Sequence, residues 1–482
     1  MTLAERVAAP DLQAAFAPLF ARIGSREGRT LVSLSLPVEG VDPVALHGIA
    51  RPLGASLWLE PDAGISLVGI GEAWAARQSH EARFGIISLA WRMLLEDAIV
   101  HAPNAPRGTG PLLLGGFGFD DEPPRSETWQ GFEAGCMVLP ALLLTTTPEG
   151  TWLTASIIVE PGGVAPSTMA LSLSETWANL AATQVRPSGP SHQRLQVTAQ
   201  TPDAAAWHGS VARLAGAVGR GRLDKAVLSR AVSLQAASDI DVSAVLRRLE
   251  ISAPESTVFA FGRGPRTFMG ATPERLVSLS GRELRTMAMA GSTPRGADAA
   301  ADDALAAALL ASDKEREEHA VVVDMLRAAL LPLADELSIP RKPQVARFQH
   351  VQHLLTPVSG RLRDDADVLA LVERLHPTPA VGGTPRELAL ELIAEEETHE
   401  RGWYTGPVGW VDRDGDGEFV VGLRSGVVHD DRATLFAGCG IVADSDPGRE
   451  WDESATKLLA RSEEHTSELQ SPMYLVCRLL LE

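Results

Sequence analysis

The amino-acid sequence predicts an α+β protein with large antiparallel sheets. Segments with helical and strand periodicity follow one another in mixed order, without the strict alternation of a doubly wound fold. The last third of the chain is rich in strand-like runs. No internal repeat with a period of about 20–50 residues is present, which argues against a solenoid or a propeller.

Size and charge limit the classes of protein that fit. The chain has 482 residues, 45% hydrophobic and 22% charged, as expected for one large or two ordinary globular domains. Its 43 Lys and Arg against 62 Asp and Glu give a net charge of −19, which argues against non-specific binding to nucleic acid or anionic membranes. Residues 1–6 lack the apolar region of a signal peptide, and no apolar run reaches about 18 residues, so we expect a soluble cytoplasmic protein. The 3 cysteines lie far apart and indicate neither a disulfide framework nor a zinc site.

The first half of the fold, residues 1–190, alternates apolar runs with Gly and Pro turns. We expect strands at 30–37, 55–59, 112–119, 136–146 and 152–160, and a helix at 84–100. Glycines within 115–118 would allow close approach of neighbouring backbones. A stretch rich in Pro, Gly and Ser at 161–191, with one short helical segment, predicts a link to the second half.

The second half, residues 200–461, carries most of the chemistry. We expect helices at 204–219, 242–252, 298–311, 314–331 and 368–375, strands at 225–233, 258–262, 403–412, 419–428 and 434–442, and a hairpin of 275–279 with 283–289. Residues 462–482 contain no Ala or Gly and resemble an adapter-derived tail seen on many unrelated predicted proteins. We expect this tail to be non-native and exclude it from the fold.

The run from Cys439 to Lys457 is the most informative part of the chain. Glycine leads out of an apolar strand, Ser445 or Asp446 offers a helix N-cap, and Pro447 fits the first helical position. The helix would carry three charged side chains on one face: Glu450, Glu453 and Lys457. Such a face suits a divalent cation and an anionic substrate, and the alternative is a solvated face with a Glu–Lys pair.

A second acidic pair, Glu315 and Glu318, lies three residues apart on the helix predicted from 314. Ser312 and Glu315 would alone form a capping box, which is the structural alternative. Carboxylates from both helices, with substrate oxygens and waters, would suit Mg²⁺, which prefers oxygen ligands.

Lys225 and Glu274 are candidates for acid–base chemistry. Lys225 begins an apolar strand, where desolvation can lower the pKa of a lysine that acts as general base. The alternative is a strand-end lysine that reaches into water. Glu274 follows Thr272 and Pro273, an order that also begins a helix or turn, so capping is the alternative role for its carboxylate.

Residues 412–417, with the sequence DRDGDG, imitate the start of a calcium-binding loop. Gly417 stands at position six, but the twelfth position, where a bidentate Glu is required, is Leu423. The apolar strands on either side predict a β-hairpin turn instead.

Eight segments in order make the chain resemble the chorismate-utilising enzymes, and among them the isochorismate synthases. They are KAVLSR (225–230), ATPERL (271–276), MAGSTPRG (289–296), DKEREEH (313–319), VQHL (351–354), LHPTPAVGGTP (375–385), RGWYTGPVG (401–409) and the run 439–457. GGFGFD (115–120) also fits the first half of that family. The resemblance covers roughly residues 30 to 460.

This resemblance implies one large domain with two layered antiparallel sheets, peripheral helices and an active site between the sheets. It also implies chorismate as substrate and Mg²⁺ as cofactor. Lys225 would activate the water that attacks C2, and Glu274 would protonate the departing C4 hydroxyl. The implied metal ligands are Glu318 and Glu453, with Glu315 and Glu450 close behind.

Further roles carry over by motif. Tyr404 and Arg424 would hold the enolpyruvyl carboxylate, for which a planar guanidinium is suited. His353 would lie beside the ring, or else be a core histidine bonded to the backbone. The other implied substrate contacts are Gly291, Ala380, Gly438, Gly440 and Lys457.

Related activities fit the chain less well. Anthranilate-type relatives are not expected to carry Lys225, and the lysine typical of aminodeoxychorismate-type relatives is missing from residues 290–293. We therefore expect no glutamine amidotransferase as partner. The sequence leaves the oligomeric state open, and the family resemblance implies a monomer. Salicylate synthases share Lys225 and Glu274, but tend to have Thr at the position of Ala380. The other alternative is a relative that binds chorismate without catalysis. The residues do not distinguish menaquinone, siderophore and salicylate formation as the fate of the product.

Overall fold

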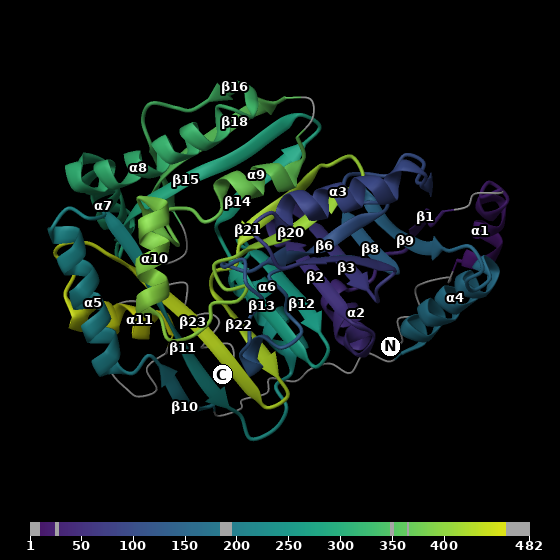
Figure 1. Cartoon of the computed structure of the whole chain (residues 1–482), viewed down its shortest axis with the longest axis horizontal. Helices are drawn as coiled ribbons and strands as arrows, with labels where there is room; N and C mark the ends of the chain where they lie inside the picture. Colours follow the sequence, from purple (N-terminus) through teal and green to yellow (C-terminus); the bar gives the residue numbers. More distant parts are fainter. Residues whose placement is uncertain (1–9, 25–27, 184–194, 348–350, 364–365, 459–482) are drawn as a thin grey trace.

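The computed structural model describes residues 10–24, 28–183, 195–347, 351–363 and 366–458, which form two large sheets with helices around them (Figure 1). The thirteen-stranded sheet has the order β10 (Gln196–Thr201), β11 (Lys225–Gln235), β23 (Arg432–Ile441), β22 (Ser425–His429), β13 (Arg266–Thr272), β12 (Thr257–Arg263), β2 (Ala55–Glu60), β3 (Ile65–Ile70), β8 (Leu142–Thr147), β9 (Gly150–Val159), β1 (Thr30–Val38) and β5 (Ile99–His101), with β19 (Gly383–Thr384) beside β11. Its pairs are antiparallel apart from β1 with β5.

The ten-stranded sheet has the order β16 (Ala334–Ser338), β18 (Val351–Leu362), β15 (Glu283–Pro294), β14 (Arg275–Ser280), β21 (Gly417–Val421), β20 (Pro407–Asp412), β6 (Leu112–Phe117), β7 (Gly135–Leu139) and β4 (Trp74–Gln78), with β17 (Gln344–Arg347) beside β18. The predicted α+β class with large antiparallel sheets is confirmed.

The two sheets enclose an aromatic core. Trp129, Phe268, Trp403 and Phe436 lie in it and are almost fully buried. The ring centroids of Trp129 and Phe268 are 5.3 Å apart. Glycines let the strands approach closely, since a Cβ on Gly115 would lie 2.0 Å from the carbonyl oxygen of Cys136 on β7. The expected role of the glycines in 115–118 is thereby confirmed.

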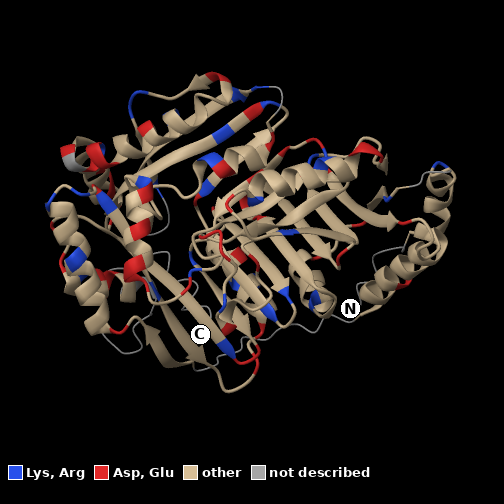
Figure 2. Cartoon of the chain, in the orientation of Figure 1, with Lys and Arg blue, Asp and Glu red and all other residues tan. Residues whose placement is uncertain are grey.

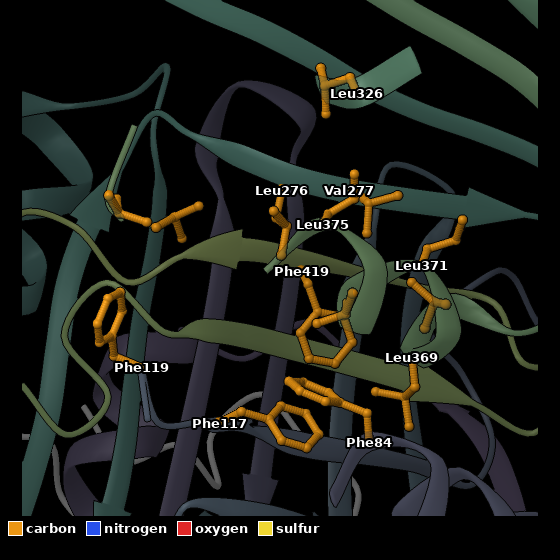
Figure 3. Close-up of a cluster of buried hydrophobic side chains, with 14 of the residues drawn as sticks. Phe84, Phe117, Phe119, Leu276, Val277, Leu326, Leu369, Leu371, Leu375 and Phe419 are labelled. Carbon is orange, nitrogen blue, oxygen red and sulfur yellow. The ribbon is translucent and has the colours of Figure 1, made fainter. Parts of the chain in front are cut away.

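The outer faces are covered by amphipathic helices. One face of the thirteen-stranded sheet packs against α1 (Leu12–Phe20), α2 (Pro43–Ala50), α4 (Pro166–Ala182) and α6 (Val242–Ser252). A second core joins the ten-stranded sheet to α3 (Arg83–Glu96), α8 (Asp313–Leu330) and α9 (Val368–Leu375), and extends to α5 (Ala204–Gly219) and α10 (Arg386–Glu396). Figure 3 shows part of it, with Phe84 and Phe117 packed side by side below Phe419. The remaining helices are α7 (Ala299–Ala311) and α11 (Pro447–Leu458).

The chain crosses between the two sheets several times, and three of its short crossings bear on the expected strands or on the site. These are residues 140–141 between β7 and β8, 273–274 between β13 and β14, and 422–424 between β21 and β22. The expected strands 136–146 and 419–428 are therefore wrong as single strands, because Pro140 and the turn at Gly422 redirect the chain to the other sheet. Apolar runs do not show such a change of sheet.

Other sequence-based boundaries also need correction. The helix expected at 84–100 ends at Glu96, because residues 99–101 pair with β1. The stretch 161–191 holds a 17-residue helix, α4, and not a short segment. The strand expected from 403 begins at Pro407, because the residues before it form a turn. Strand β13 and helix α10 were not expected, whereas α5, α6 and α9 have the predicted bounds.

We predict that Phe117→Ala destabilises the fold strongly. Phe117 is 0% exposed and its ring centroid lies 4.2 Å from that of Phe84, so truncation leaves a cavity that should cost about 3–5 kcal/mol. Urea unfolding measures this loss. Met93→Ala on neighbouring α3, where Met93 is 63% exposed, is the control and should change stability by less than about 0.5 kcal/mol. Equal losses in both variants would contradict the packing described.

Candidate active site

Lys225, the first residue of β11, reaches across the end of the thirteen-stranded sheet. Its Nζ donates a hydrogen bond of 2.8 Å to Oε1 of Glu318 on α8. Its aliphatic chain lies over Gly440 of β23, where an added Cβ would stand 2.4 Å from Cε of Lys225. Only glycine leaves room for this path. The lysine is 23% exposed, so it is not the strand-end lysine in open water that was the alternative.

Glu274 and Arg424 lie on two adjacent crossings between the sheets. The backbones are joined there, because Val421 N donates to the carbonyl oxygen of Glu274 and Ala271 N donates to that of Arg424. Burial raises the pKa of Glu274 to about 7, against the opposing charges of Arg424 and Lys225. Burial also lowers the pKa of Arg424 to about 10, which leaves the guanidinium charged at neutral pH. A carboxyl group that is about half protonated at pH 7 thus lies within electrostatic reach of two cations.

Glu315 does not close a capping box. Its backbone N–H donates to Oγ of Ser312, as the sequence predicts, but its side chain turns to β15 and accepts from the N–H of Ser292 at 3.2 Å. Gly291 makes this possible, because its φ is +78° and an added Cβ would stand 3.1 Å from Oε2 of Glu315. His353 of β18 pairs with Ser292 across the sheet. Glu315, Gly291 and His353 are therefore close neighbours.

Tyr404 is 2% exposed and stacks on Phe436 of β23, with ring centroids 5.2 Å apart. A Cβ on Gly438 would lie 3.4 Å from its hydroxyl oxygen, so the two expected substrate contacts are adjacent. Burial raises the pKa of Tyr404, which keeps its hydroxyl neutral and able to donate.

Backbone strain marks the same region. Four described non-glycine residues have positive φ, and two of them, Asn104 and Asp430, are types that tolerate it. The other two are Thr405, with φ +62°, and Arg424, with φ +48°. Strained backbone of this kind is frequent at binding and catalytic sites.

The run 439–457 folds as the sequence predicts. Helix α11 begins at Pro447, and Oδ1 of Asp446 accepts from Arg449 N as the cap. Glu450 is partly buried and Glu453 is exposed. The side chain of Lys457 lies outside the described residues.

The four acidic candidates provide only carboxylate oxygens, which is the donor chemistry that Mg²⁺ prefers. Glu318 already lies beside a cation, the ammonium of Lys225. The described residues nevertheless hold no cluster of three or more His, Cys, Asp or Glu side chains arranged to bind a metal ion. The chemistry of these donors therefore fits Mg²⁺, while the assignment of the four carboxylates as its ligands stays a prediction.

The calcium-like loop is a hairpin turn. Oδ1 of Asp412 accepts from the N–H groups of Asp414 and Asp416 and so closes the turn between β20 and β21. This confirms the structural prediction for residues 412–417.

Sequence reasoning missed several buried polar residues behind the site. Arg401 is 1% exposed and pairs with Glu397, which also accepts from the N–H and Oγ of Ser229 on β11. Arg230 is 0% exposed, lies 3.7 Å from the ring centroid of Trp451 and donates to Oγ of Ser454, which fixes α11 to β11. The motifs KAVLSR and RGWYTGPVG contain both arginines. Trp451 and Ser454 are distant from Arg230 in the sequence, and Val227, which accepts from Arg401, is also distant, whereas Glu397 lies only four residues before Arg401.

Charged residues are frequent on two helices beside the site, α8 and α10. Figure 2 shows acidic and basic residues along α8 and α10, while most positions on the central strands are uncharged. Among the described helices, none combines the length and the apolar character needed to cross a lipid bilayer.

Comparison with known proteins identifies the family. The sequence profile described as "Chorismate binding enzyme" matches residues 18–461. The chain belongs to the chorismate-binding enzyme family. The match ends one residue before the segment 462–482, which lies outside the described residues.

Similar members of the family have names that agree with one another. "Salicylate biosynthesis isochorismate synthase" of Pseudomonas aeruginosa is 38% identical over 435 residues, 90% of each chain. "Isochorismate synthase MenF" of Bacillus subtilis is 34% identical over 437 residues, covering 89% of this chain and 92% of its own.

Solved structures share the chorismate-binding fold. The menaquinone-specific isochorismate synthase MenF of Escherichia coli has a TM-score of 0.78 at 24% identity and covers 98% of this chain and 100% of its own. Anthranilate synthase component I of Streptococcus pneumoniae has a TM-score of 0.66 at 20% identity, over 82% of this chain and 91% of its own.

We predict that Gly440→Ala displaces Lys225 from Glu318. The new Cβ would stand 2.4 Å from Cε of Lys225, so the side chain must leave its present path. A crystal structure of the variant should show this, with strand pairing retained. Gly85→Ala on α3, where nothing lies within 4 Å of an added Cβ, is the control. An unmoved lysine in Gly440→Ala would refute the clearance role.

Proposed function

We propose that the chain is an isomerase that converts chorismate to isochorismate. The carrying observation is the arrangement of Lys225, which reaches across Gly440 to Glu318, within electrostatic range of a Glu274 whose pKa is about 7. A base and a carboxylic acid that is protonated near neutral pH are what water attack at C2 and loss of the C4 hydroxyl require. The names of relatives at 38% and 34% identity support the same activity.

In the proposed reaction, Lys225 acts as the base and takes one proton from the water that attacks C2. Transfer of a proton from Lys225 back to Glu274 through solvent after the reaction restores both groups. Glu274 donates its proton to the C4 oxygen, which leaves as water. Arg424 and Tyr404 hold the enolpyruvyl carboxylate, and His353 lies beside the ring. The other proposed contacts are Gly291, Ala380, Gly438, Gly440 and Lys457.

We propose that Glu318 and Glu453, supported by Glu315 and Glu450, hold Mg²⁺ against the ring carboxylate. The metal would neutralise substrate charge in a site that excludes water. Because water and not ammonia is the nucleophile, we also propose that the enzyme works without a glutamine amidotransferase.

The test of the activity is product analysis after incubation with chorismate and Mg²⁺. We expect isochorismate without salicylate, and no turnover from Lys225→Ala or Glu274→Gln. Salicylate with pyruvate would instead indicate a salicylate synthase. Absence of turnover by the intact chain would indicate a relative that binds without catalysis, and activity in either variant would refute its assigned role.

The pH profile tests Glu274. Because the acid is active only when protonated and its pKa is raised to about 7, kcat/KM should fall as the pH rises above about 7. Steady-state kinetics between about pH 6 and 9 measure this limb. A profile without any loss on the alkaline side would rule out Glu274 as the acid.

Metal removal tests the acidic residues. EDTA should abolish turnover and added Mg²⁺ should restore it, because the carboxylates alone repel a dianionic substrate. Binding of Mn²⁺, followed by electron paramagnetic resonance, should weaken in Glu318→Gln and Glu453→Gln. The exposed neighbour Glu317→Gln is the control. Full turnover in EDTA, or equal binding by all three variants, would contradict the metal site.

A further inference from the structure

We propose that Arg401 and Glu397 form a positioning pair that fixes three segments of the substrate site relative to one another. The proposal rests on the function proposed above and extends it to residues that do not touch the substrate. The three segments are the start of β11 with Lys225, the loop 377–382 with Ala380, and the turn with Tyr404.

Arg401 reaches all three segments. Its Nη2 donates to the carbonyl oxygen of Val227 at 2.7 Å, two residues beyond Lys225. Its Nη1 donates to the carbonyl oxygen of Val381 at 2.8 Å, one residue beyond Ala380. The same Nη1 lies 3.4 Å from Oγ1 of Thr405, next to Tyr404. Each contact is therefore one or two residues from a proposed substrate contact or from the base.

Glu397 holds the guanidinium in the orientation that these contacts need. Its two oxygens accept from Nε of Arg401 at 2.8 Å and from Nη2 at 2.6 Å. With the backbone and threonine contacts, five hydrogen bonds use the five N–H donors that an arginine possesses. The guanidinium carbon also lies over the ring of Phe119, 4.1 Å from the ring centroid, which adds a cation–π contact. A lysine, with three donors and no planar fork, cannot make this set.

The pair is buried and electrically balanced. Arg401 is 1% exposed and Glu397 is 6% exposed. Burial would raise the pKa of Glu397, but the charge and hydrogen bonds of Arg401 lower it below its usual range, so the carboxylate is ionised. Glu397 also accepts from the N–H and Oγ of Ser229, which joins it to β11 a second time.

The strained turn at Thr405 depends on the same pair. Thr405 has φ +62°, an unfavourable value for a β-branched residue, and its N–H donates to the carbonyl oxygen of Gly422. Gly422 begins the crossing that carries Arg424. Arg401 thus contacts the turn that carries Tyr404, and this turn is bonded to the crossing that carries Arg424, so the pair acts on both proposed ligands of the enolpyruvyl carboxylate.

The chain offers a matched control. Arg213 on α5 and Glu396 form another two-bond Arg–Glu pair, with distances of 2.7 and 2.6 Å, but Arg213 is 63% exposed. Within the described part of the chain, the hydrogen bonds given for Arg213 go to Glu396 and Ser210, which lie outside the three segments. Substitutions there remove the same kind of ion pair where its cation is exposed to solvent, so that the contribution of the pair is screened, although Glu396 itself is 11% exposed.

The experiment compares Arg401→Lys and Glu397→Gln with Arg213→Lys and Glu396→Gln, all at a temperature where circular dichroism shows folded protein. We expect kcat/KM for chorismate to fall about 100-fold in Arg401→Lys, since misplacement of reacting groups by about 1 Å has effects of this size. In Glu397→Gln, which preserves side-chain volume, kcat/KM for chorismate should fall about 10-fold. This variant tests the pair if Arg401→Lys does not fold. In the two controls, Arg213→Lys and Glu396→Gln, kcat/KM should stay within about twofold of the wild-type value.

Hydrogen–deuterium exchange provides the readout that does not need turnover. In Arg401→Lys and Glu397→Gln, the backbone amides of peptides covering 225–231, 377–383 and 402–406 should exchange faster than in the wild-type chain. The exchange rates of other peptides should not change. If the wild-type chain made no isochorismate, the proposed function would fail while this local pattern could still support the pair. Folded variants with wild-type kcat/KM, or with exchange unchanged in these peptides, would overturn it.

Discussion

The antiparallel pairing of β11 with β23 is the constraint on which the rest of the site depends. In this register Val227 faces Gly440, so the side chain of Lys225 finds a glycine where any other residue would block it. The lysine can then lie along the strand end and reach Glu318 on α8. The same strand β23 leads directly into α11, and Arg230 of β11 fixes that helix through Trp451. One strand pair therefore sets the position of the base and of the acidic helix α11.

The passage of the chain between two sheets provides the other half of the site. Strands β13 and β22 are neighbours in one sheet, and β14 and β21, which follow or precede them, are neighbours in the other. The two crossings must consequently lie side by side, and they carry Glu274 and Arg424. Sheet topology brings together an acid and a cation that are far apart in the sequence, and burial at the crossing raises the pKa of the acid.

Local patterns predicted what local physics determines. The bounds of α5, α6 and α9 follow from apolar periodicity with an aspartate N-cap, and Pro447 begins α11 as expected. The changes of sheet at Pro140 and Gly422 were missed because an apolar run looks the same whichever sheet it joins. The side chain of Glu315 was left open between a capping box and a metal site, and the structure shows a third partner, Ser292, which strand pairing places nearby. Arg401 was missed for the same reason, since its acceptors Val227 and Val381 are backbone atoms of distant segments and carry no sequence signal.

The source of the new hydroxyl tests the central claim most directly. If Lys225 activates a solvent water for attack at C2, isochorismate formed in ¹⁸O-water must carry the heavy oxygen in its C2 hydroxyl, as mass spectrometry of the fragmented product would show. The oxygen lost from C4 would be found in solvent. Isochorismate whose C2 hydroxyl holds the original light oxygen would mean that the hydroxyl migrates within the substrate, and would contradict the account of Lys225 as the base.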